Sequence, residues 1–210
     1  MGIEDMERTR QAKPLIVRWL RRTVLTDRRM TALNKYLIEQ TNIIDNLRSN
    51  MELDKALQLC KQVSTHLSLH PQFNPVTLQI NTYLHFLNVS AAVYLCIGDF
   101  DSTSRLVSAF DRVANGNIID NLIIYSHLNI VVELHIKLSS YGIPMKIVDR
   151  ILPSITEPYW RGLFLLKKGF VEIHQSPNVF TINSLCEALK EANASGDNSL
   201  IAQVYIGLAR

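Results

Sequence analysis

The chain has 210 residues, of which 47% are hydrophobic and 20% charged, and its formal net charge is +3. This length suits one domain with a substantial core, and the composition is ordinary for a soluble globular protein. The three cysteines are far apart in the sequence, which excludes a disulfide framework and a cysteine-based zinc site.

Cysteine usage suits a cytoplasmic protein, and the distribution of charge makes the N-terminal end basic. Residues 1–35 contain nine Lys or Arg and four Asp or Glu, so the rest of the chain is slightly acidic. Cys60, Cys96 and Cys186 occupy apolar positions of helical segments, which predicts buried, reduced thiols. Residues 1–13 are too polar for a secretory signal. The apolar stretch 83–97 is too short for a membrane span and holds His85 and Asn88, and 118–138 is long enough but contains too many charged and polar residues.

Two helices are predicted at the N-terminal end. Pro14 suits the first turn of a helix that runs to residue 25, where Ile16, Trp19, Leu20 and Val24 fall at helical spacing. Thr26 or Asp27 then caps a second helix that runs to about residue 48.

Short breaks rich in Gly, Pro, Asn and Ser divide the remainder into further segments with apolar stripes. Apolar residues recur at i, i+3, i+4 and i+7, and no run shows the sustained alternation of a strand, which excludes an all-β fold. We therefore predict an all-α protein, a right-handed stack of antiparallel helix pairs. The predicted helices cover 51–69, 76–97, 101–114, 118–140, 144–152, 158–175, 178–194 and a last one from about 199.

Three places resemble the tetratricopeptide repeat. Around the Gly98 turn, the matching residues are Leu87, Ala91, Tyr94, Gly98 and Phe100, although Thr103 stands where the repeat has alanine. At the second place, Gly169 could be the small residue on the first helix of a pair, with Ala188 and Leu189 on the second helix of that pair. At the third place, Gly207 repeats the Gly169 position 38 residues later.

The stretch from 188 to 210 is similar to the helical-repeat domains of large bacterial transcription activators of the maltose-regulator type, and to stand-alone repeat adaptors. The resemblance covers about half the chain and implies a stack of helix pairs similar to tetratricopeptide repeats (TPR-like). We expect residues 1–26 to form a basic segment with a capping helix and residues 27–210 to form the repeat domain.

The sequence offers no pattern typical of catalysis. Six histidines are scattered without metal-ligand spacing, and no glycine loop suits a phosphate. No serine has a nucleophile-elbow context, and no cysteine has a flanking motif that would activate it. We predict no enzyme, no cofactor and no metal.

An arginine stripe near the N-terminus is one candidate partner surface. Arg18, Arg21, Arg22 and Arg29 could form an electrostatic patch for nucleic acid or an acidic partner, or simply the solvated face of a capping helix. Only Trp19 is aromatic there, and it lies on the apolar stripe, so base stacking is not supported.

A second candidate surface follows from the TPR-like register, which would line a concave groove with the first helix of each pair. It would present His85, Asn88 and Asn129, and further along Leu166, Phe170 and Ile173. The alternative is that these side chains are buried beneath the next repeat.

The predicted function is a non-enzymatic protein–protein interaction module, either a regulatory adaptor or the sensing and assembly part of a larger regulator. A nucleic-acid-binding regulator and a peptide or small-molecule sensor are the alternatives. The last helix looks truncated, and if unpaired it would expose Ile201, Val204, Tyr205 and Leu208, so we expect a homodimer through the C-terminal end.

Overall fold

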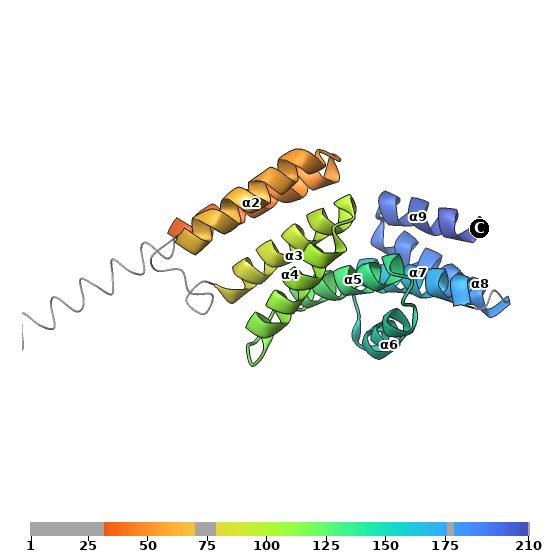
Figure 1. Cartoon of the computed structure of the whole chain (residues 1–210). Coiled ribbons are helices and arrows are strands. Elements are labelled where there is room, and N and C mark those ends of the chain that lie inside the picture. The colour runs from red at the N-terminus through yellow and green to blue at the C-terminus, as the bar shows by residue number, and fades with distance from the viewer. Residues whose placement is uncertain (1–31, 70–78, 176–178, 210) are drawn as a thin grey trace, which may run out of the picture.

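The computed structural model describes residues 32–69, 79–175 and 179–209, and in these ranges all regular structure is helical (Figure 1). This confirms the all-α prediction. Residues 32–49 are helical and precede α2. The other elements are α2 (Leu53–Leu69), α3 (Ile80–Ile97), α4 (Phe100–Ala114), α5 (Asn121–Lys137), α6 (Gly142–Ile151), a 3₁₀ turn η1 (Leu152–Ser154), α7 (Pro158–Gln175), α8 (Val179–Ser195) and α9 (Asn198–Leu208).

A Gly-Asp pair makes two of the sharp turns between helices. Gly98 ends α3 with φ of 82°, a left-handed conformation that a residue without a Cβ adopts freely. Asp99 then caps α4 by accepting from the Ser102 N–H at 3.0 Å. Gly196 and Asp197 repeat the arrangement before α9, with φ of 70° at the glycine. The breaks seen in the sequence are therefore helix terminators with a defined geometry.

The helices lie in an elongated row in which sequence neighbours pack together (Figure 1). α3 contacts α4 and also α5, α5 contacts α6 and also α7, and α7 contacts α8 and also α9. The buried side chains form three clusters along the row. One joins residues 32–49 to α2, α3 and α4, a second joins α5, α6 and α7, and a third joins α7, α8 and α9.

Two glycines of α7 allow the closest helix contact. A Cβ on Gly169 would lie 2.6 Å from Leu185 Cδ2, and one on Gly162 would lie 3.2 Å from the Ala192 backbone nitrogen. Gly169 therefore has the role of a small contact residue expected from the sequence, and Gly162 shares it seven residues earlier.

The cysteine prediction is right for one residue and wrong for two. Cys60 is buried on α2, whereas Cys96 and Cys186 are exposed. Cys186 directly follows Leu185, which is buried, and one step along a helix turns the side chain by about 100° away from the core.

The last helix is not unpaired, so the prediction that it exposes Val204 is wrong. Leu200 and Val204 are fully buried where α9 packs on α7 and α8, and Ile201 and Leu208 are half-buried against the same cluster. Tyr205 remains exposed, as expected.

Within the described ranges, α3 is the one helix long and apolar enough to cross a membrane by length and composition, and 44% of it is buried. It packs against α2, α4 and α5, which are the surroundings of a core helix.

Candidate binding groove

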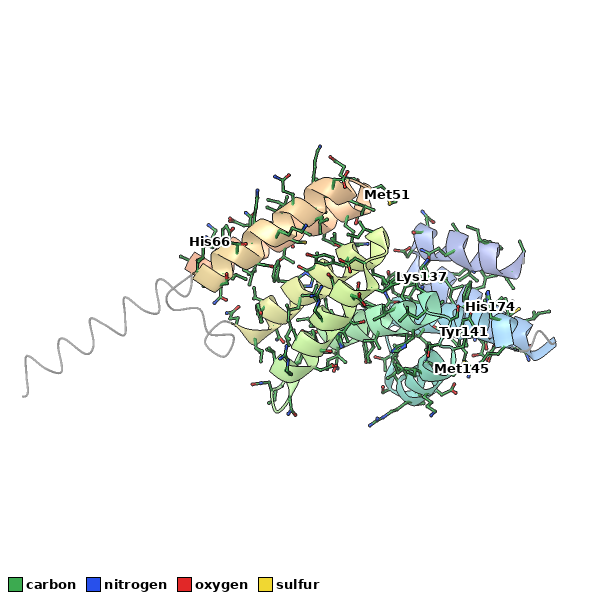
Figure 2. The ribbon with its side chains drawn as sticks, in the orientation of Figure 1. Met51, His66, Lys137, Tyr141, Met145 and His174 are labelled. Atoms are coloured by element: carbon green, nitrogen blue, oxygen red, sulfur yellow. The ribbon has the colours of Figure 1, made fainter. Side chains whose placement is uncertain are left out.

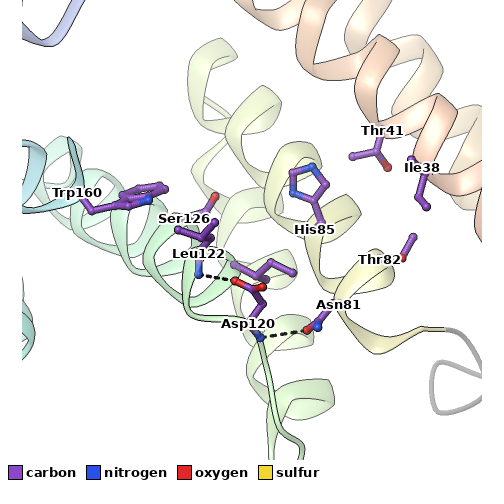
Figure 3. A pocket seen from close by; sticks show the side chains of 10 residues that line it. Ile38, Thr41, Asn81, Thr82, His85, Asp120, Leu122, Ser126 and Trp160 are labelled. Atoms are coloured by element: carbon purple, nitrogen blue, oxygen red, sulfur yellow. Dashed lines mark hydrogen bonds between the residues drawn. The ribbon is translucent and has the colours of Figure 1, made fainter. Parts of the chain in front are cut away.

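Four helical segments enclose a pocket of about 460 Å³, which we call the Trp160 pocket (Figure 3). Its walls come from residues 32–49, from the beginnings of α3 and α5, and from the first turn of α7. Four of its ten described lining residues are apolar, and the others, except Asp120, carry neutral polar groups. The lining residues are Ile38, Thr41, Asn81, Thr82, His85, Asp120, Leu122, Ile123, Ser126 and Trp160.

Hydrogen bonds between segments position this pocket. The Gln79 N–H donates to Asn34 Oδ1 at 3.2 Å, which fixes the start of α3 against residues 32–49. The Asp120 N–H donates to Asn81 Oδ1 at 3.3 Å, and Asp120 Oδ1 accepts from the Leu122 N–H at 2.8 Å (Figure 3). Asp120 is thus the N-cap of α5 and is held against α3 at the same time.

Trp160 is held by an aromatic cluster. Its ring lies edge-on to Tyr159, with centroids 5.3 Å apart, and is 6.0 Å from Tyr125 and 6.4 Å from Phe164. Phe164 is completely buried and Tyr125 nearly so. The indole therefore lines the pocket from a rigid base.

A polar network joins the buried Asn88 of α3 and His127 of α5 to the exposed Asp111 of α4. The Asn88 side-chain N–H donates to the Ile123 carbonyl at 3.0 Å, and Asn88 Oδ1 lies 3.2 Å from His127 Nδ1. His127 Nε2 lies 3.1 Å from Asp111 Oδ1, and its ring stacks on Phe110. Since Ile123 also lines the pocket, the network supports the pocket floor.

Two histidines, His85 in the pocket lining and His127 in the polar network, have lowered pKa values. Burial lowers the pKa of His127, and the Asp111 carboxylate opposes this shift. Loss of solvent also lowers the pKa of His85, against the attraction of Asp45. Both rings are therefore neutral at pH 7, and the pocket contains no Lys or Arg among its described lining residues.

A second pocket of about 460 Å³, the Lys137 pocket, lies further along α5, beside the middle of α7 and the C-terminal half of α9. Lys137 comes from the last turn of α5, and Tyr141 from the turn that follows (Figure 2). Glu133 pairs with Lys167 of α7, and the Lys137 ammonium is 3.9 Å from the same carboxylate. The lining residues are Glu133, Ile136, Lys137, Tyr141, Leu166, Lys167, Phe170, Gln203, Ile206 and Gly207.

The structure brings some of the predicted site residues to these pockets. His85 lines the Trp160 pocket, and Leu166 and Phe170 line the Lys137 pocket. Asn129 is half-buried on α5, between the residues that α5 gives to the two pockets, and its Oδ1 makes no hydrogen bond to a described residue.

Other predicted residues lie elsewhere. The prediction that Asn88 faces a groove is wrong, because it is 1% exposed and bonded inside the network above. Ile173 packs against the α7–α9 cluster and is not among the described lining residues of either pocket. Arg18, Arg21, Arg22 and Arg29 lie outside the described residues.

Sequence reasoning missed Asp120, Trp160 and Lys137. A usable signal was present on α5, where Leu122, Ser126, Asn129 and Glu133 share one helical face. Trp160 gave no such signal, because its exposure depends on how four separate segments meet.

Comparisons of the chain with family models, with curated proteins and with solved structures find no match. Among the described residues, no three His, Cys, Asp or Glu side chains gather as a metal site would require. The groups that converge in the pockets are apolar side chains, amides, hydroxyls and paired charges, which suit binding.

Proposed function

We propose that the protein is a TPR-like, right-handed stack of helix pairs that acts as a non-enzymatic protein-interaction module in the cytoplasm. The pattern of contacts supports the stack, because α3, α5 and α7 each contact their own partner helix and also the next member of the series, α5, α7 and α9 respectively. The module would be a regulatory adaptor or the sensing and assembly part of a larger regulator.

The observation that carries the proposal is the position of the two pockets. The Trp160 pocket is lined by residues 32–49 and by α3, α5 and α7, and the Lys137 pocket by α5, α7 and α9 with Tyr141 before α6. Neither pocket has a described lining residue from α2, α4 or α8. α5 and α7 contribute lining residues to both pockets, and we propose that the two pockets belong to one groove. Exposed Ile38 and Leu122 leave apolar surface there that a partner would cover.

The test is an affinity capture that compares two substitutions of serine by tryptophan. Ser126→Trp fills the Trp160 pocket, whereas Ser104→Trp adds the same ring to an exposed position on α4. Partners of the groove should be retained by the wild type and Ser104→Trp and lost, at least tenfold in intensity, by Ser126→Trp. Identical capture by all three proteins would refute the groove as the interaction site.

A small-molecule sensor is a second candidate, because 460 Å³ lies within the range of about 300–1,000 Å³ typical of ligand pockets. Its signature would be a ligand-dependent rise in the unfolding temperature that Ser126→Trp abolishes. The nucleic-acid alternative depends on Arg18, Arg21, Arg22 and Arg29 and would show as salt-dependent anisotropy changes with generic DNA or RNA, lost on charge reversal.

A homodimer through the C-terminal end is also proposed, on Tyr205 and the half-buried Ile201 and Leu208 rather than on Val204. Sedimentation at increasing concentration tests it.

A further inference from the structure

We infer that the groove takes an extended segment of a partner protein that places an apolar side chain in the Trp160 pocket and an acidic side chain in the Lys137 pocket. This inference rests on the proposed function and specifies the chemistry of the partner.

The Trp160 pocket favours an apolar side chain. Ile38 is 44% exposed and Leu122 50% exposed, and together with the half-buried Trp160 they present apolar surface to water. The charged group at the pocket edge is the Asp120 carboxylate, which caps α5. That carboxylate disfavours an acidic group at this end, so the partner cannot bind equally well in the reversed direction.

The Lys137 pocket favours an acidic side chain. Its described lining residues include two lysines and one glutamate, so it has a surplus of one positive charge. Glu133 and Lys167 form the closer and less exposed pair, with side chains 24% and 18% exposed. Lys137 is 54% exposed and 3.9 Å from the shared carboxylate, which leaves its ammonium available to a carboxylate of the partner.

The polar groups of the groove favour an extended segment over a helix. Asn81, Thr82 and Ser126 bring neutral donors and acceptors to the wall of the Trp160 pocket, and Gln203 does so in the Lys137 pocket. An extended chain has unpaired N–H and C=O groups that such side chains can satisfy. A helix bonds its own backbone and would leave the wall groups unpaired.

The spacing along α5 sets the spacing in the partner. From Ser126 to Lys137 the helix rises by about 16 Å, at about 1.5 Å per residue. An extended segment covers that distance in about five residues, whereas a helical one needs about eleven. The partner should therefore have its acidic residue about five positions from its apolar anchor.

The experiment is a selection of random twelve-residue peptides displayed on phage against the full chain. Ser126→Trp and Ser104→Trp serve as the groove-blocked protein and its matched control. Peptides that bind the wild type and Ser104→Trp but not Ser126→Trp should share a large apolar residue and an Asp or Glu about five positions away. Groove-dependent peptides without the acid, or with a spacing of about eleven, would overturn the inference and leave the proposed function standing. If no groove-dependent peptide is selected, both fail.

A charge exchange provides the second readout. With a selected peptide, Lys137→Glu should weaken binding by about tenfold, and replacing the peptide acid by Lys should restore it. Lys146→Glu, an exposed position on α6, is the control and should leave binding unchanged. Lys137→Met retains the aliphatic stem and tests the charge alone if Lys137→Glu unfolds. Equal binding of the acidic and basic peptides by the wild type would refute the assignment of Lys137.

Discussion

His127 stacks face to face on Phe110, with ring centroids 3.7 Å apart and planes 8° from parallel, while both of its ring nitrogens point at oxygen atoms. A neutral imidazole has one N–H, so it can donate to Asn88 or to Asp111 but not to both. The buried ring is therefore the group through which pH acts on this part of the protein.

Stability should decrease as the pH falls from 7 towards 5. Burial lowers the pKa of His127, and that of His85 is lowered in the same way, so the unfolded chain binds more protons than the folded one in this range. The neutral histidines contribute fully to the free energy of unfolding above the pKa of an unfolded histidine, about 6.5. That contribution is lost as the pH drops towards the lower pKa of the folded protein. Urea unfolding at pH 7.5 and 5.5 measures the difference in the free energy of unfolding between the two pH values, and His127→Gln should reduce that difference. Stability that rises on acidification would contradict the direction of the shift.

Asn88→Ala should destabilise the protein by about 1–3 kcal/mol, because it removes the buried hydrogen bond to the Ile123 carbonyl and leaves His127 Nδ1 unpaired. Asn42→Ala, on the exposed side of residues 32–49, is the matched control and should change the free energy of unfolding by less than about 0.5 kcal/mol. Chemical denaturation of the two variants gives the comparison. Equal effects would mean that the network contributes nothing specific.

Gly169→Ala should be destabilising even though alanine is the better helix former. The new methyl group would overlap Leu185, and overpacking costs about 1–3 kcal/mol, against a propensity gain of about 1 kcal/mol. A Cβ added at Gly142, at the start of α6, would have no neighbouring atom within 4 Å, so Gly142→Ala should be neutral or stabilising by up to about 1 kcal/mol. Thermal unfolding distinguishes them, and a stabilised Gly169→Ala would show that α8 can move away from α7.

Two of the three thiols should react with an aromatic disulfide reagent in the folded protein. Cys96 and Cys186 are exposed, whereas Cys60 is 1% exposed and its burial raises the pKa of the thiol. Absorbance should show two groups modified quickly and the third only after denaturant is added. Cys60→Ser should remove only the labelling that requires denaturant. Fast labelling of all three thiols without denaturant would indicate that α2 detaches readily.

The helices could be predicted from the sequence because their ends carry chemical signals. Gly98 and Asp99 mark a left-handed turn and an N-cap whatever the surroundings, and the break at Gly196 and Asp197 does the same. The start of α6 was less well marked. Pro144 suggested the first turn, but the helix already begins at Gly142.

The candidate site was only partly predictable, because it depends on which side of each helix meets the next one. α3 is apolar on most sides, so its sequence does not distinguish the groove residue His85 from the buried Asn88 three positions later. His127 looked isolated in the sequence, and its partners Asn88 and Asp111 come from two other helices. Trp160 lines a pocket whose opposite wall is more than a hundred residues away in the chain.

The three buried clusters are not equally joined. The middle and C-terminal clusters share Leu152 and Trp160 in their partly buried shells, whereas the N-terminal cluster shares no described member with either. Across that seam, the Asn88–His127–Asp111 hydrogen bonds connect α3 and α4 to α5. These bonds therefore help to hold the front half of the row against the back half.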